Sequence, residues 1–255
     1  MWDLYDRLIA AIPEDARAEE VIIGRHWVML QATCGAGLAM AVEESSQGFG
    51  LAGTLRGRPL VELAALVKSW NFLEASVGTA ALCAFYNGPQ GEVLRASLVP
   101  GIESINGNAF EVLGSQLDGK RVAVIGHFPD LERLAERCQL SILERRPQPG
   151  DLPDSAAEYV LPEQDFVFIT GTTLTNKTLP RLLELSAKAT VVLVGPSTPL
   201  AGVLFEYGVS YLGGLVVREA DQVRRLTAEN AEREVLKAGG QMVLLRAPRA
   251  SAVPR

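Results

Sequence analysis

The chain of 255 residues has little of what several classes of protein require. Its three cysteines, Cys34, Cys83 and Cys138, are odd in number and widely spaced, which excludes a disulfide framework and a paired-cysteine metal knuckle. The formal net charge is -6, and acidic and basic residues are interspersed without a basic stripe. Nucleic acid is therefore not an expected partner. We expect a reducing, cytoplasmic setting.

Long apolar runs and histidines are also scarce. No run approaches the roughly 20 apolar residues that a membrane span needs, and residues 1–11 have the pattern of an amphipathic helix rather than a signal peptide. A membrane is therefore not an expected partner. The only histidines are His26 and His127, so a site with several histidine ligands or a Ser-His-Asp triad is hard to assemble.

The first part of the chain is typical of a small α+β unit. Short apolar or alternating stretches at 21–24, 27–33 and 37–42 are separated by glycine-containing turns and predict an antiparallel meander. Residues 59–86 carry apolar side chains at helical spacing and predict two helices packed on that sheet. Gly, Pro and Asn then dominate up to about residue 108, so we place the end of a first domain at residue 113.

Strand and helix patterns alternate from residue 114 to residue 247. This alternation predicts a Rossmann-like α/β domain with a mostly parallel sheet covered on both faces. The expected strands are 121–125, 140–143, 166–170, 190–194, 209–212 and 241–245. The expected helices are 129–138, 179–187, 200–207 and a polar helix at 219–237. We expect residues 248–255 to form a disordered tail.

Ligands in open parallel sheets bind beyond the carboxyl ends of the strands, where helix-start amides favour anions. The first strand ends at Gly126, a single glycine where a dinucleotide fold has three, so no dinucleotide is expected. His127 follows, and it could bind a metal, move a proton or bond to backbone. Glu144 ends the second strand at an offset that suits a ribose hydroxyl, or else joins a solvated cluster with Arg145 and Arg146.

The next two strand-end loops are rich in hydroxyl and amide groups. Residues 170–178 read TGTTLTNKT, which is more than one helix cap requires, so we favour ligand contact over pure capping. In GPSTP, Thr198 is a natural helix cap before Pro199, and the same loop would also suit an anion. The candidate binding residues of these loops are Gly171, Thr172, Thr173, Asn176, Gly195, Ser197 and Thr198.

Three residues of the first domain are further candidates. Asn71 and Glu74 open an otherwise apolar helix, where they could face the loops of the other domain or simply cap the helix. Cys34 lies in the hairpin TCGAG and could bring a thiol to the same place, although an isolated cysteine is more often a small buried apolar residue.

Several strings together closely resemble, in order and spacing, the heavy-metal chelation domain family, which was first catalogued as a domain of unknown function. The strings are VAVIGHFPDLERL, LERRPQPGDLP, DFVFITGTTLTNKTLPRLLEL, VVLVGPSTPL and LFEYGVSYLGG. Upstream, SWNFLEASVGTAALCAFYN resembles the companion domain of that family, which is itself similar to the amino-terminal domain of enolase.

The resemblance implies an enolase-N-like domain joined to a Rossmann-like domain, with a site in the cleft between them and a role in binding or chelating heavy metals. It implies a site formed by His127, Glu144, Thr172, Thr173, Asn176, Ser197, Thr198, Asn71 and Glu74. Where the family often shows asparagine after the helix, this chain has Leu82-Cys83-Ala84.

Two classes of function follow from these residues. In the first, His127 with Glu74 or Glu144, aided by Cys34, could bind a transition metal ion or present a chelating small molecule to it. In the second, the protein is an enzyme that holds an adenosine-containing ligand, such as S-adenosylmethionine, through Glu144 and Thr172. His127 or Glu74 would then be the acid or base. Binding without turnover and assembly into a homo-oligomer are also compatible with the sequence.

Overall fold

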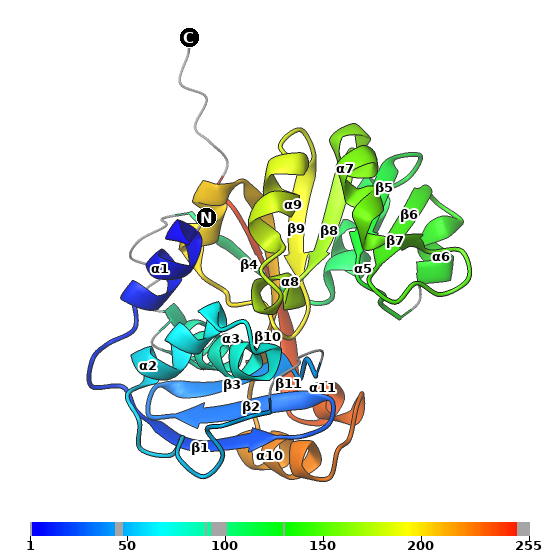
Figure 1. The fold of residues 1–255 in the computed structure, drawn as a ribbon. Helices are drawn as coiled ribbons and strands as arrows, with labels where there is room; N and C mark the ends of the chain where they lie inside the picture. The colour runs from blue at the N-terminus through cyan, green and yellow to red at the C-terminus, as the bar shows by residue number, and fades with distance from the viewer. Residues whose placement is uncertain (1, 44–47, 90, 93–100, 130, 249–255) are drawn as a thin grey trace.

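The structure is a computed structural model that describes residues 2–43, 48–89, 91–92, 101–129 and 131–248. Within these residues the chain forms one antiparallel sheet of three strands and one mostly parallel sheet of eight strands (Figure 1). No helix in the described ranges is long and apolar enough to cross a membrane. The tail that we expect to be disordered lies, from residue 249 onward, outside the described residues.

The first half of the chain has the predicted meander and helices. Its elements are α1 (Asp3–Ala10), β1 (Ala18–Ile23), β2 (Trp27–Ala32), β3 (Gly35–Met40), α2 (Leu60–Ala65), the 3-10 turn η1 (Leu66–Lys68) and α3 (Phe72–Tyr86). The alternation along β2 explains why both faces are covered: Val28 and Leu30 join the core that contains α3, and Trp27 and Met29 join a second cluster on the opposite side.

That second cluster is completed by residues from the end of the chain. Helices α10 (Ala220–Ala228) and α11 (Glu234–Ala238) place Val223 and Val235 in one apolar cluster with Trp27. In Figure 1, α10 lies below the three-stranded sheet and α11 lies at one end of it. We expected one helix over 219–237. It is interrupted at Asn230, which has a left-handed φ of 59° and accepts a 2.7 Å hydrogen bond from the Arg25 amide.

The large sheet has the strand order β4-β11-β10-β9-β8-β5-β6-β7. Only β4 and β11 enter it antiparallel to their neighbours. Its strands are β4 (Glu103–Asn106), β5 (Arg121–Ile125), β6 (Gln139–Glu144), β7 (Leu152–Pro153), β8 (Phe166–Thr170), β9 (Thr190–Val194), β10 (Val209–Val217) and β11 (Gly240–Arg246). The prediction of a mostly parallel sheet is therefore confirmed, and β10 is five residues longer than the strand predicted at 209–212.

Helices cover both faces of this sheet. Alternate residues such as Ala123 and Val167 join the core with α8 (Thr172–Thr175), α9 (Leu179–Leu185) and the 3-10 helix η5 (Gly202–Tyr207). Their neighbours Val122 and Phe168 pack on α5 (Ala109–Leu113) and α6 (Leu131–Ala135). The short elements η2 (Gly114–Gln116), η3 (Asp154–Ala156), α7 (Ala157–Val160) and η4 (Leu161–Glu163) complete the described connections. Burial on both faces is the usual state of a parallel sheet.

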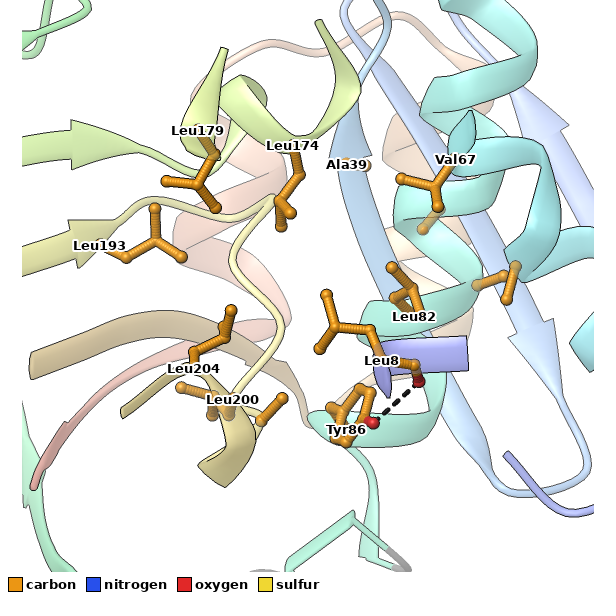
Figure 2. Close-up of a cluster of buried hydrophobic side chains, with 14 of the residues drawn as sticks. Leu8, Ala39, Val67, Leu82, Tyr86, Leu174, Leu179, Leu193, Leu200 and Leu204 are labelled. Atoms are coloured by element: carbon orange, nitrogen blue, oxygen red, sulfur yellow. Dashed lines mark hydrogen bonds between the residues drawn. The ribbon is translucent and has the colours of Figure 1, made fainter. Parts of the chain in front are cut away.

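One apolar core joins the two halves of the molecule, which are the three-stranded sheet with α1, α2 and α3 (the first half) and the eight-stranded sheet with its helices (the second half). Figure 2 shows Leu8 and Leu82 from the first half facing Leu174, Leu193 and Leu204 from the large sheet and its helices. Buried hydrogen bonds also connect the two halves along this contact, which we call the seam. The Tyr5 hydroxyl donates to the Leu174 carbonyl at 3.2 Å, and the hydroxyls of Thr79 and Thr175 lie 2.9 Å apart.

The expected domain boundary at residue 113 stays a prediction, as do the names Rossmann-like and enolase-N-like for the two units. Strand β4 comes before that boundary, yet it pairs with β11 in the large sheet. Helix α5, which also precedes the boundary, packs on the same sheet through Ala109 and Leu113.

Candidate functional site

The strand order of the large sheet indicates one position along its edge where a ligand could bind. From β5 the chain continues to β6 and β7 on one side, and then returns to β8, β9 and β10 on the other side. At such a switch point the connections diverge, and ligands bind outside the carboxyl ends of the two central strands. Gly126 follows β5, and a Cβ built on it would lie 3.1 Å from Thr170 at the end of β8, so the two loops are in contact.

The ring of Phe128 lies close to the glycines of this edge. A Cβ at Gly126 would be 3.5 Å from the ring, and a Cβ at Gly195 would be 3.7 Å from it. Phe128 is held by Phe110, at 5.3 Å between ring centroids, and Phe110 stacks on Phe168 at 4.5 Å. An aromatic ring therefore approaches Gly126, which follows the strand where a dinucleotide fold has its glycine-rich, pyrophosphate-binding turn. The expectation that no dinucleotide binds stays a prediction.

His127 pairs with an acidic residue that sequence reasoning missed. Its Nδ1 lies 3.3 Å from Oδ2 of Asp151, whose side chain is only 3% exposed, whereas the His127 side chain is 30% exposed. The same Asp151 oxygen accepts the Gln148 amide at 3.0 Å. Asp151 stands in the string LERRPQPGDLP, but nothing local to that loop indicates a histidine partner 24 positions earlier.

Glu144 holds the loops on either side of it through backbone hydrogen bonds. Its carboxylate accepts from the amides of His127 at 3.2 Å, Arg145 at 2.6 Å and Arg146 at 3.5 Å. These bonds fix the start of the His127 loop and account for an acidic residue at this position without a ribose. The adenosine-containing ligand stays a prediction with no support from this geometry.

The threonine-rich loop after β8 is folded on itself. Thr172–Thr175 form the single turn α8, in which the buried Thr173 hydroxyl donates to the Thr170 carbonyl at 2.7 Å. Asn176 accepts from the Thr178 hydroxyl at 2.7 Å, and Thr172 donates to the Met40 sulfur at 3.9 Å. Most of these polar groups therefore stabilise the turn itself, and contact between this loop and a ligand stays a prediction.

The loop after β9 is held from outside, by Asn87 at the end of α3. The Asn87 amide group donates to the carbonyls of Thr198 at 3.1 Å and Leu215 at 2.9 Å, and its oxygen accepts from the Leu200 amide at 2.7 Å. Thr198 is therefore not a helix cap as predicted: η5 begins at Gly202, and the buried Thr198 hydroxyl has no hydrogen-bond partner among the described residues. Sequence reasoning missed Asn87 because an Asn-Gly-Pro string is also typical of a turn.

Other contacts join these loops to each other and to the first half. Ser197 accepts from the Met40 amide of β3 at 2.9 Å. A Cβ at Gly171 would lie 2.6 Å from backbone atoms of Ser197 and Thr198, so glycine is needed for the close approach of the two loops.

The candidates of the first half have structural roles in their own surroundings. Asn71 caps α3 by accepting from the amides of Leu73 at 3.1 Å and Glu74 at 3.4 Å, which is the capping alternative. Glu74 accepts from the Ser69 hydroxyl at 2.6 Å. Burial raises the pKa of the Cys34 thiol to about 11, so Cys34 is protonated at neutral pH and is not a ready metal ligand.

The predicted metal ligands His127, Glu74 and Cys34 therefore do not form one set. Among the residues that the structure describes, no group of three or more histidine, cysteine, aspartate or glutamate side chains could hold a metal ion. The structure does bring together Gly126, His127 and Glu144, with Asp151 added. A ligand cleft between the two halves stays a prediction.

Comparison with known proteins agrees with the resemblance read from the sequence. An uncharacterised protein of Methanocaldococcus jannaschii is 27% identical over 199 residues, 73% of this chain and 71% of that protein. The crystal structure of a protein with unknown function from Desulfitobacterium hafniense DCB-2 has a TM-score of 0.87 and 40% identity, covering 96% of this chain and 98% of that one. A protein with unknown function from Pyrococcus horikoshii is similar in fold, with a TM-score of 0.74, 20% identity and the same coverage.

Two family models match, both with the description "Putative heavy-metal chelation". One matches residues 5–86. The other matches residues 108–246, which is more than half of the chain, and both crystal structures are of proteins from that same family. This chain therefore belongs to the family described by those words.

Proposed function

We propose that the protein binds a transition metal ion carried by a small chelating molecule, and that His127 at the β5–β8 switch point is the residue that binds the metal. The observation that carries this proposal is the pairing of the partly exposed His127 ring with the buried carboxylate of Asp151 at 3.3 Å. In the neutral imidazole, a carboxylate facing Nδ1 can only accept, so Nδ1 carries the hydrogen and Nε2 keeps its lone pair. Metal-binding histidines are commonly oriented in this way by a carboxylate.

The small number of metal ligands at the His127 site explains why we expect the metal ion to be bound to a chelator before it reaches the protein. The described residues contain no group of three or more side chains that could hold a metal ion. A single imidazole therefore leaves most coordination positions of a transition metal to other donors. A chelator would supply these donors, and the protein would add the last one. The family description, chelation of heavy metals, supports this class of ligand. The chelate is cargo in this proposal, and no reaction is required.

Titration of tag-free protein with Ni²⁺ and with Ni²⁺–nitrilotriacetate, which leaves coordination positions open for an imidazole, tests the proposal. Calorimetry should show saturable binding of the nickel chelate to the wild type and at least about tenfold weaker binding to His127→Ala. His26→Ala is the matched control, because it removes the other histidine of the chain, and it should bind as the wild type does. Equal binding by His127→Ala and the wild type would contradict the proposal.

Asp151→Asn should weaken the same binding by about 10–100-fold, the usual effect of removing the carboxylate that orients a metal-binding histidine. The variant keeps the size of the side chain, so thermal unfolding should confirm that the fold is intact. Asp151→Glu restores a carboxylate and should recover part of the affinity. A binding constant that does not change in Asp151→Asn would remove Asp151 from the site.

A further inference from the structure

Lys177 has an unusual backbone conformation at the seam between the two halves. It follows α8 with a left-handed φ of 64°, a conformation that is uncommon for residues other than glycine and asparagine. Its Nζ donates to the Ser69 carbonyl, which lies in the first half, and to the Thr175 carbonyl of α8 at 2.7 Å. A strained backbone that holds one side chain in place is a recurring property of functional sites.

Two aromatic rings lie beside the amine, at cation–π distances. Nζ lies 5.6 Å from the centroid of the Trp70 ring and 5.0 Å from that of Phe72. The Trp70 residue is 69% exposed. The half-buried amine is therefore next to an aromatic surface that solvent, or a ligand, can reach.

No carboxylate in the described part of the chain pairs with Lys177. The charged side chains nearest in sequence to its contacts have partners of their own: Glu74 accepts from Ser69, and Lys68 pairs with Asp6. On the following helix, Arg181 pairs with Glu158 and Glu184. Without a compensating charge, burial lowers the pKa of the Lys177 amine to about 8.

The hydrogen bonds are compatible with the neutral amine as well as with the ammonium. The two carbonyls of Ser69 and Thr175 accept two N–H groups, which are all the donors that the neutral form has. In the neutral form the lone pair of Nζ is left unused. A desolvated lysine with an available lone pair is a nucleophile toward carbonyl carbon.

We infer that Lys177 is a reactive lysine that takes a small aldehyde or ketone with a planar or apolar body as a covalent ligand, with Trp70 as the stacking surface. The Nζ lone pair attacks the carbonyl carbon and forms a C–N bond while the carbonyl π electrons move to oxygen. Two protons pass from nitrogen to that oxygen, which leaves as water, and a C=N bond remains. No oxidant or reductant is needed. This inference shares no residue with the His127 site.

Competitive labelling of the wild-type protein tests this inference without relying on a variant that folds. The probe is 4-carboxybenzaldehyde with cyanoborohydride at pH 7, and peptide mass spectrometry reports the rate at each lysine. The neutral fraction of an amine with a pKa of about 8 is roughly 300-fold that of an ordinary lysine at pH 7. Lower basicity offsets part of this advantage, so we expect Lys177 to react at least about tenfold faster than Lys68, Lys120, Lys188 and Lys237.

Labelling of Lys177 at or below the mean rate of the other four lysines would overturn the inference. Two variants then separate the amine from the stacking surface. Lys177→Arg should lose the fast label, and the control Lys120→Arg should keep it. Trp70→Ala should slow labelling by the aromatic aldehyde several-fold more than labelling by formaldehyde. An equal effect on both probes would contradict the role of Trp70.

Discussion

Gly78→Ala should destabilise the protein by about 3 kcal/mol or more, although the same change inside an exposed helix stabilises by about 1 kcal/mol. Gly78 lies in α3, and a Cβ at this position would be 2.0 Å from the Val67 nitrogen and 2.7 Å from the Leu66 carbonyl carbon. These are backbone atoms, which cannot rotate away as a side chain can. Urea denaturation would measure the loss in the free energy of unfolding.

Gly114→Ala is the control for this prediction. Its Cβ would meet only the end of the Arg137 side chain, at 3.1 Å, which can move, so we expect a change within about 1 kcal/mol. If Gly78→Ala unfolded at the same urea concentration as the wild type, the close contact between α3 and the turn η1 would be wrong. On the β3 side of the same helix, a Cβ at Gly37 would lie 2.2 Å from the Ala80 oxygen.

Asn87→Ala should lower the free energy of unfolding by about 3 kcal/mol, because three buried backbone groups each lose one hydrogen bond. These groups are the carbonyls of Thr198 and Leu215 and the amide of Leu200, and Asn87 itself is 3% exposed. Each unsatisfied buried polar group costs about 1–3 kcal/mol, and relaxation of the loop recovers part of the sum.

The matched control for Asn87 is Asn108→Ala. Asn108 is exposed and makes one cap bond, accepting from the Phe110 amide at 3.0 Å, so its loss should cost about 1 kcal/mol. Denaturation curves of the two variants side by side would separate the buried connection from an ordinary helix cap. Equal losses in both variants would show that Asn87 does not hold the β9 loop in place.

Periodicity along the chain predicted the elements that are decided by local pattern. The apolar run at 121–125 and the alternation at 27–33 became β5 and β2, because these side chains are buried whatever partner covers them. Strand β4 was not predicted. Its sequence ESIN has mostly exposed side chains, so only pairing with β11 makes it a strand.

Contacts between residues far apart in the chain could likewise not be predicted from the sequence. The pattern in 219–237 indicated a polar helix, but it could not indicate that Val223 packs against Trp27, some 200 positions earlier. Candidate residues were chosen by residue type, by their positions at predicted strand ends and helix starts, and by resemblance. His127 and Glu144 were therefore predicted together with Glu74 and Cys34, which have separate surroundings. Asp151 and Lys177 could not be chosen as candidates from the sequence, because only the fold places Asp151 beside His127 and Lys177 beside Ser69.

Segments from both halves of the chain pack on the three-stranded sheet, and this limits where the chain can be cut or recombined without exposing its core. A fragment that ended at residue 113 would lack α10 and α11, and it would expose Trp27, Met29 and Leu38 on one side of the three-stranded sheet. It would also lose the leucines that Figure 2 shows against Leu8 and Leu82. Large exposed apolar surfaces promote aggregation. Gene fusion or exchange between relatives would therefore have to carry residues 218–240 together with the first half.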